Sequence, residues 1–450
     1  MKNSAHNRSW TLSSSFRPAT AALGIAIAVV LALATVLTQS AQAQTFTVLH
    51  SFAGAPDGAN PVVGLTVDKG GNLYGTTWFG GNTGGNCGPM GCGTVFRLRR
   101  SGSGWTFAPL YKFSGPDGLG PQGRVAFGPD GTLYGTTANG QGDSCSCGNV
   151  FNLKPPPTRP QTPLTPWVET VIHQFSPSPG EGIDPTGDLA FDPAGNLYGT
   201  TLAGGYWNHC GGGVGCGTVY ELTPSAGGWT ENVIYTLKGG TDGTYPSDGV
   251  VLDSSGNLYV TSAEGYYDDN AQWGAIFELS PSGSGWTETT LYDFQNGTGI
   301  FPEGGLIRDT AGNLYGATPA TGGSGGGGTV YRLTPSNGGW SFQNLYTLTG
   351  GSGRSGPFGK LLMDAAGNLY GTTYGEGAYN KGSVFKLTPG NGGWTLTSLH
   401  DFTGGSDGAN PEDGVVMDAN GNLYGTTYVG GTASANCQEY QCGVVFEITP

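Results

Sequence analysis

The chain has 450 residues, and glycine (85) and proline (28) together occupy a quarter of its positions. It also carries 50 aromatic residues (19 Phe, 21 Tyr and 10 Trp), which a disordered chain would lack. Its formal net charge of −14 at pH 7 disfavours phosphate backbones and anionic membranes as partners. These quantities exclude a helical protein and a strongly basic nucleic-acid-binding protein.

Residues 1–43 have the pattern of a secretory signal peptide. Lys2, Arg8 and Arg17 precede an apolar run over residues 21–37, and Ala41-Gln42-Ala43 supplies the small residues that signal peptidase accepts. We predict cleavage after Ala43 and export to a periplasmic or extracellular space. An uncleaved membrane anchor is the alternative, since the run approaches a spanning length. Without the leader's three basic residues, 15 Lys and Arg remain against 32 Asp and Glu, a net charge of −17.

A seven-residue motif, mostly Gly-Asn-Leu-Tyr-Gly-Thr-Thr, recurs along the rest of the chain. Its seven copies are 71–77, 131–137, 195–201, 256–262, 312–318, 367–373 and 421–427. Successive copies are 54 to 64 residues apart. A period of this size, built from strand-like units, is typical of propeller blades.

The fifth copy illustrates the elements that each unit predicts. Four strands are expected, at residues 305–308, 313–318, 329–334 and 340–348. Asp309–Gly312 and Pro335–Gly339 are typical hairpin turns between them. One sheet of this size cannot bury both faces alone, whereas sheets packed face to face around an axis cover one another.

The two ends of the chain together form one unit. The seventh copy runs through residues 443–448 and supplies only three strands, and the N-terminal segment 45–52 matches the fourth strand of the sixth unit, 395–402. We therefore predict an all-β fold, a seven-bladed β-propeller of four-stranded blades whose last blade is closed by the N-terminal strand (3+1). Residues 44–450 are expected to form this single domain, as a monomer with no membrane span.

The heptad, its following Gly-Gly loop and a Gly-Thr-Val-Phe/Tyr strand resemble the GloVer (Gloeo/Verruco) tandem repeats of secreted and surface bacterial proteins. The turn Asp-x-x-Gly-Asn-Leu-Tyr is also similar to NHL-type propeller repeats. The resemblance covers essentially all of residues 44–450. It implies a bacterial propeller and no established enzymatic activity.

All cysteines lie between the second and third strands of their units. They are Cys87, Cys92, Cys145, Cys147, Cys210, Cys216, Cys437 and Cys442. An even count in an exported chain favours disulfides, and we predict one bridge within each loop. The couple Cys145 and Cys147 is the awkward one, because a single intervening residue strains a bridge. Bridges between loops and a zinc site are the alternatives, and the sequence predicts no metal and no cofactor.

Long loops predict the binding rim. Connections from strand two to three and from strand four to one emerge on the same side, and the long loops are there. Candidate binding aromatics on this rim are Trp78, Phe79, Tyr206, Trp207, Tyr266, Tyr267, Trp273 and Tyr428. Flat aromatic faces among Asn, Asp and Gly suit sugar rings or an extended peptide. Alternatively, the rings only cover their own loops.

Histidines and most carboxylates have structural explanations. His50, His173 and His400 occupy a fourth-strand position that other units fill with Tyr, which indicates packing. The repeated Asp at the first hairpin is typical of turn stabilisation. Glu264, Asp268 and Asp269 break the pattern. They are candidates for acid/base chemistry on a glycoside or uronate, or for a solvated acidic loop.

The sequence predicts a secreted, non-enzymatic binding or cell-envelope interaction module. It would bind a glycan or a protein through the long-loop rim, and no catalytic residue is assigned. The alternative is a polysaccharide-active lyase or hydrolase that uses the loop carboxylates. A calcium-stabilised structural protein is a third interpretation, suggested by the acidity.

Overall fold

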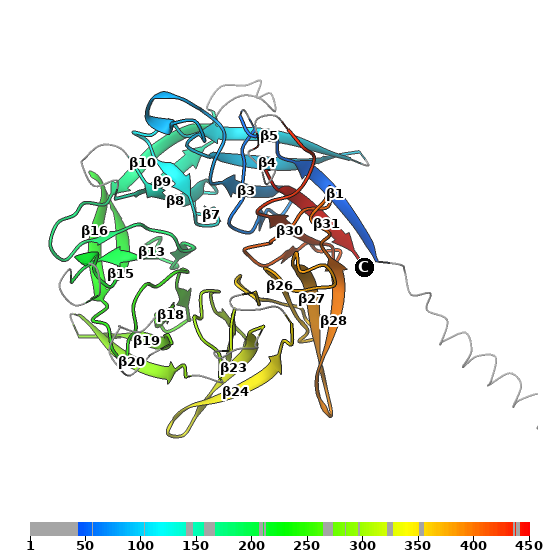
Figure 1. The fold of residues 1–450 in the computed structure, drawn as a ribbon. Helices are drawn as coiled ribbons and strands as arrows, with labels where there is room; N and C mark the ends of the chain where they lie inside the picture. The colour runs from blue at the N-terminus through cyan, green and yellow to red at the C-terminus, as the bar shows by residue number, and fades with distance from the viewer. Residues whose placement is uncertain are drawn as a thin grey trace, which may run out of the picture. The chain divides into compact units, whose positions relative to one another are not determined.

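The computed structural model shows a ring of antiparallel sheets formed by Thr45–Thr449 (Figure 1). It describes residues 44–55, 57–102, 104–140, 147–156, 167–206, 210, 213–263, 273–283, 285–295, 298–321, 327–350, 355–434, 437 and 442–450. The predicted leader lies outside these residues. In the part of the chain that is described, no helix is long and apolar enough to cross a membrane.

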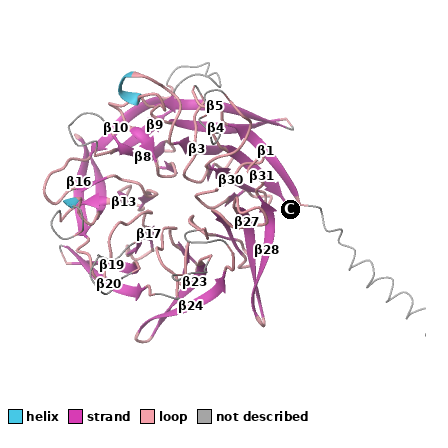
Figure 2. Cartoon of the chain, in the orientation of Figure 1, coloured by secondary structure: helices cyan, strands magenta, loops and turns pink. Residues whose placement is uncertain are grey.

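Four strands build each of the seven blades, and strands dominate the regular structure (Figure 2). From the axis outward the strands follow the sequence order in the first six blades, and in the seventh the N-terminal strand is outermost. The innermost strands are β2 (Thr66–Val67), β7 (Ala126–Phe127), β12 (Ala190–Phe191), β17 (Val251–Leu252), β21 (Ile307–Arg308), β25 (Leu362–Met363) and β29 (Val416–Met417). The second strands are β3 (Leu73–Thr77), β8 (Leu133–Asn139), β13 (Leu197–Thr201), β18 (Leu258–Ser262), β22 (Leu314–Thr318), β26 (Leu369–Thr373) and β30 (Leu423–Thr427).

The two outer strands of each blade are longer and form a hairpin. The third strands are β4 (Thr94–Ser101), β9 (Asn149–Lys154), β15 (Thr218–Ser225), β19 (Ala275–Ser282), β23 (Thr329–Ser336), β27 (Ser383–Gly390) and β31 (Val444–Thr449). The outermost are β5 (Gly104–Lys112), β10 (Val168–Gln174), β16 (Gly228–Thr236), β20 (Gly285–Asp293), β24 (Gly339–Thr347), β28 (Gly393–Asp401) and β1 (Thr45–Ser51). Short additions are η1 (Gly85–Cys87), β6 (Leu119–Pro121), β11 (Gly182–Ile183) and β14 (Ala203–Gly204).

The N-terminal strand closes the ring. The seventh sheet has the order β1-β31-β30-β29, so β1, the first strand of the propeller, pairs with β31, the last strand of the chain (Figure 1). Phe46 lies opposite Ile448, and His50 lies opposite Val445. The Phe46 ring also lies 5.6 Å from that of Phe446. The predicted seven-bladed propeller with 3+1 closure is confirmed.

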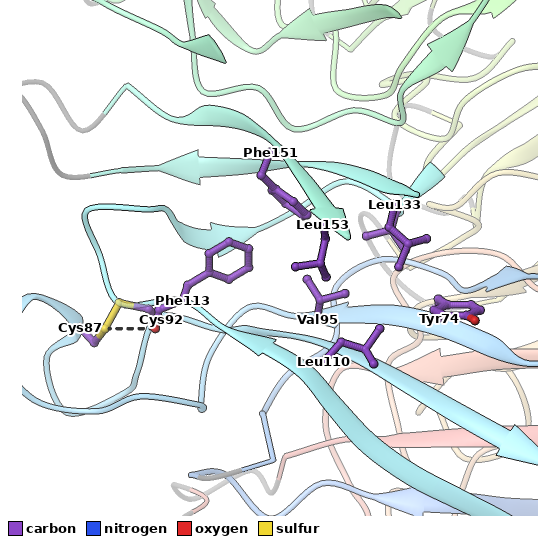
Figure 3. Packing of buried hydrophobic residues seen from close by; sticks show 10 residues of the cluster. Tyr74, Cys87, Cys92, Val95, Leu110, Phe113, Leu133, Phe151 and Leu153 are labelled. Carbon is purple, nitrogen blue, oxygen red and sulfur yellow. Dashed lines mark hydrogen bonds between the residues drawn. A yellow bond between two sulfur atoms is a disulfide. The ribbon is translucent and has the colours of Figure 1, made fainter. Parts of the chain in front are cut away.

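Small and large residues of the repeat interlock at the centre of each blade. The heptad's second glycine lies under the aromatic ring of the third strand, and a Cβ on Gly75 would come within 2.5 Å of Phe96 Cζ. The heptad leucine is buried and packs against the preceding blade. Figure 3 shows this contact between blades one and two, where Val95 and Leu110 face Leu133 and Leu153. Each buried side chain of this size contributes about 1.5–3 kcal/mol, so the seven interfaces together hold the ring.

The repeated aspartate clamps its own hairpin. Asp309 Oδ1 accepts hydrogen bonds from the backbone N–H groups of Ala311 (2.9 Å) and Asn313 (2.9 Å). Its Oδ2 accepts from Asn313 Nδ2 (2.7 Å) and from the Tyr315 hydroxyl (3.0 Å). Burial alone would raise the pKa of Asp309, but these hydrogen bonds lower it below its ordinary value. The motif Asp-x-x-Gly-Asn-Leu-Tyr is thus one hydrogen-bonded unit, which confirms its predicted structural role.

A glycine–proline joint connects each blade to the next. The glycine that opens the third strand has positive φ and faces a proline of the following blade; a Cβ on Gly382 would lie 2.5 Å from Pro411 Cδ. The residue before that proline donates its N–H across the joint, as Asn410 does to the Lys381 carbonyl (2.8 Å). The joint between the chain ends has the same form, with Gly443 against Pro61.

The residue before the joint proline is held in an unfavourable conformation. Five non-glycine residues there have positive φ: Asn60, Asp184, Tyr245, Phe301 and Asn410. Left-handed backbone costs about 1–2 kcal/mol for a residue with a Cβ, most clearly for bulky ones. The joint geometry therefore overrides local preference, and it turns the residues after the proline toward the propeller axis.

Disulfides and histidines have structural roles. Bridges join Cys87 to Cys92, Cys210 to Cys216 and Cys437 to Cys442, as predicted. Cys147 is buried, and its predicted partner Cys145 lies outside the described residues. The His400 ring stacks 3.7 Å from that of Phe46, and its Nε2 lies 3.2 Å from Asp407 Oδ2. This confirms the packing role predicted for the fourth-strand histidines.

Candidate binding pocket at the propeller axis

Every blade contributes to a cavity of about 600 Å³ at the axis. Most lining residues follow a joint proline and precede an innermost strand, and two others come from loops between second and third strands. They are Val62, Val63, Trp78, Gln122, Thr186, Asp188, Ser247, Asp248, Glu303, Gly304, Phe358, Gly359, Lys360, Tyr374, Glu412 and Asp413. Because both loop types emerge on one rim, this cavity lies on the predicted binding side.

Five charged residues form a cluster at the cavity, called the charged floor below: Arg124, Asp188, Asp248, Lys360 and Asp413, of which all but Arg124 line the cavity. Arg124 of blade two donates from Nε to Asp413 Oδ2 (2.6 Å) and from Nη2 to Asp413 Oδ1 (2.5 Å) in blade seven. Asp413 also accepts from the backbone N–H groups of Gly64 and Lys360. A Cβ on Gly64 would lie 2.7 Å from the Arg124 guanidinium carbon, so glycine there lets the arginine cross blade one. Burial would raise the pKa of Asp413, but Arg124 lowers it.

A second pair completes this layer. Lys360 Nζ of blade six lies 3.5 Å from Asp188 Oδ2 of blade three. Asp188 Oδ1 accepts from the backbone N–H of Arg124 (3.1 Å). Burial would lower the pKa of Lys360, but the surrounding aspartates, Asp188 first, raise it. Arg124 and Lys360 are therefore both charged, and each forms an ion pair with one carboxylate.

Asp248 is the third floor carboxylate, and it lacks such a cation. Its Oδ1 accepts from the backbone N–H groups of Gly249 (2.6 Å) and Asp188 (3.4 Å). Within the described residues, no lysine, arginine or histidine nitrogen forms an ion pair with it. Burial, followed by the neighbouring charge of Asp188, raises the pKa of Asp248 to about 6.

Aromatic side chains stand at one equivalent position in three adjacent blades. Trp78, Tyr374 and Tyr428 each directly follow the heptad in blades one, six and seven. Their backbone N–H groups donate to the residue before the joint proline, as Trp78 does to the Asn60 carbonyl (3.1 Å). Blades two to five have smaller residues there: Ala138, Leu202, Ala263 and Pro319. One side of the rim is therefore aromatic, and Trp78 and Tyr374 line the cavity.

Glu412 brings a carboxyl group to this aromatic side. Burial raises its pKa to about 7. Burial and then the charge of Glu412 raise the pKa of Tyr374 and of Tyr428. No hydrogen bond or ion pair of the Glu412 side chain is found among the described residues. The pocket thus combines aromatic faces, carboxylates and the polar groups of Gln122, Thr186 and Ser247.

The predicted rim aromatics have different surroundings. Trp78 lines the cavity, Phe79 stacks 5.3 Å from it, and Tyr428 stands next in the aromatic row. Trp273 packs edge-on against Phe301 at 5.8 Å and covers a blade core, while Tyr206 is 48% exposed and away from the cavity lining. The other candidates lie outside the described residues: Trp207, Tyr266, Tyr267, Glu264, Asp268 and Asp269. Their roles stay predictions.

Sequence reasoning missed the charged floor. Its members are Arg124, Asp188, Asp248, Lys360 and Asp413. The sequence contained a signal for them, because each unit has a proline followed by three residues and then Leu or Val. In five of the seven units, the second or third of those three residues is charged. Aligning the seven units at this segment singles out these residues.

The fold and the cavity define a seven-bladed β-propeller with an axial pocket open toward the long-loop rim. The chain belongs to the Gloeobacter/Verrucomicrobia repeat family, which it matches over residues 32–214 and 206–437. No curated protein matches the sequence.

Solved structures share the fold at low sequence identity. One is a fungal alcohol oxidase of the AA5 family in complex with copper, 14% identical, with a TM-score of 0.52; the match covers 91% of this chain and 77% of that one. Another is the extracellular domain of a one component system from B. thetaiotaomicron, 11% identical, with a TM-score of 0.52; the match covers 89% of this chain and 40% of that one. These likenesses establish the architecture alone.

Proposed function

We propose that the protein is an exported binding module that takes a glycan into its axial pocket. The observation that carries the proposal is the combination, in one cavity of about 600 Å³, of the Trp78 and Tyr374 rings with the polar groups of Gln122, Thr186 and Ser247. Sugar rings present apolar faces and a rim of hydroxyls, and sites for them need both kinds of contact. The three disulfides support export, because such bridges persist in oxidising compartments.

A propeller suits this task physically. The pocket residues come from all seven blades, so the ring fixes their positions before any ligand arrives. A preformed site avoids much of the ordering cost of binding. Function on loops that a rigid scaffold holds in place is a common arrangement in proteins.

The test is a glycan array with the mature protein, followed by titration calorimetry on the ligands found. Trp78→Ala and Tyr374→Ala should each weaken binding by about tenfold or more, because a buried aromatic contact is lost. Tyr379→Ala is the matched control, since Tyr379 is an aromatic in the same loop as Tyr374 but is 57% exposed. Absence of glycan binding, or equal losses from all three changes, would contradict the proposal.

A polysaccharide-active lyase or hydrolase is the second candidate. It is favoured by Glu412, whose pKa is raised to about 7, a value suited to general acid or base catalysis near neutral pH. Incubation with the polysaccharides identified on the array, with product analysis, separates the two functions. Product release that Glu412→Gln abolishes would establish catalysis. Binding without product, unchanged over long incubation, would support the binding module.

A further inference from the structure

The axial pocket has more carboxylates than cations. Five carboxylates line it, Asp188, Asp248, Glu303, Glu412 and Asp413, against the single ammonium of Lys360. Arg124 does not line the cavity, but its guanidinium forms an ion pair with Asp413, which does. The arrangement therefore leaves a net negative charge inside a concave site, where low-dielectric walls strengthen the field on a ligand.

Two of the lining carboxylates, Asp248 and Glu412, carry part of this excess charge. Arg124 neutralises Asp413, and Lys360 neutralises Asp188. Asp248 receives only backbone N–H donors, and Glu412 has no hydrogen-bond partner among the described residues. Burial is the first cause of the raised pKa of both groups; at Asp248 the charge of Asp188 raises the pKa further, whereas the charge of Lys360 lowers it. A positively charged group of a ligand beside either carboxylate would supply the cation that it lacks.

The remaining lining fits a cation attached to a ring or chain. Trp78 and Tyr374 present aromatic faces, which attract ammonium groups as well as sugar faces. A uronate or sulfated sugar, in contrast, would bring negative charge against Asp248 and Glu412.

We propose that the axial pocket selects glycans that carry a protonated amine, such as oligosaccharides of glucosamine without N-acetyl groups. Amines of the oligosaccharide would lie against the Asp248 and Glu412 carboxylates, with a sugar face against the aromatic side. This inference deepens the proposed function and depends on it, because it names the chemical class of glycan that the pocket accepts.

The test compares three oligosaccharides of equal length by calorimetry near neutral pH. The probes are a chitosan oligosaccharide, its N-acetylated chitin counterpart and an oligogalacturonide. The chitosan oligosaccharide should bind about tenfold tighter than the chitin oligosaccharide, as expected for a hydrogen bond to a charged group. Added salt should weaken the former selectively.

Charge-removing variants locate the selectivity. Asp248→Asn and Glu412→Gln should each remove most of the chitosan preference, measured as the ratio of the chitosan to the chitin affinity. Asp401→Asn is the control, because it removes one carboxylate from β28, outside the pocket lining. Circular dichroism verifies folding of each variant. Because Glu412 is not a member of the charged floor, Glu412→Gln tests the selectivity without removing a charge from that cluster.

The outcomes distinguish this inference from the proposed function. Equal affinity for the chitosan and chitin probes, or a preference for the oligogalacturonide, overturns the amine selectivity and leaves glycan binding standing. Loss of chitosan preference in Asp401→Asn as large as in the pocket variants also overturns it. If none of the three probes nor any arrayed glycan binds, both proposals fail.

Discussion

Breaking the ion pair between Arg124 and Asp413 from one side should destabilise the ring. Arg124→Met removes the guanidinium and keeps most of the aliphatic stem, so Asp413 stays buried with backbone donors only. Removing one partner of a buried ion pair costs about 3–5 kcal/mol, since the other charge is left without compensation. For about 400 folded residues at about 2.1 cal/mol/K each, this free energy corresponds to a fall in Tm of roughly 4–6 °C.

Thermal unfolding followed by circular dichroism measures this change, with a double-mutant cycle to isolate the pair. Asp413→Asn combined with Arg124→Met should be less destabilised than the sum of the single changes. Arg100→Met is the exposed control, because the Arg100 side chain is 45% exposed although its Nη2 lies 2.9 Å from Glu447 Oε1. That change should cost about 1 kcal/mol or less.

The pH dependence gives a second readout. Arg124 holds the pKa of Asp413 low despite burial, so the stability from this carboxylate is present above its unfolded pKa and is lost as the pH falls. The deficit of Arg124→Met relative to the wild-type protein should therefore shrink on acidification toward about pH 3–4, near the ordinary Asp pKa. A Tm loss no greater than that of Arg100→Met, or a strictly additive cycle, would refute the reasoning.

Three further changes test the fold. Gly371→Ala should cost about 1–3 kcal/mol in denaturant unfolding, because the new Cβ would come within 2.6 Å of Phe385 Cζ, whereas Gly392→Ala, with no atom within 4 Å, should be neutral. Phe46→Ala should destabilise the whole ring by about 3–5 kcal/mol in one cooperative transition; a transition confined to the last blade would contradict closure. Burial raises the pKa of Glu376 from its ordinary value of 4.5 to about 8. The contribution of its neutral form to the free energy of unfolding is therefore complete below pH 4.5 and is lost as the pH rises through 8. Glu376→Gln should then match the wild-type Tm at acidic pH and exceed it by a few degrees above pH 8; a constant difference in Tm at all pH values would exclude this ionisation.

Much of the architecture could be predicted because the repeat makes each local rule visible seven times. The heptad marks the second strand, and the aspartate marks the hairpin that precedes it. The missing fourth strand of the last unit, with a matching segment after Ala43, predicted the pairing of β1 with β31. Disulfides between cysteines five or six positions apart also follow from proximity along the chain. All of these are nearest-neighbour relations, within a blade or between successive blades.

The pocket depended on the tertiary structure. Arg124 and Asp413 are 289 residues apart and meet only because ring closure places blades two and seven on either side of blade one. At five of the seven joints, a non-glycine residue before the joint proline has a left-handed backbone, against its local preference. Asp248 and Glu412 stand at positions where the repeats differ from one another, and their environment is formed by the segments of all seven blades together. Periodicity therefore determines the scaffold, whereas the chemistry of the axis depends on differences between repeats that only a closed ring brings together.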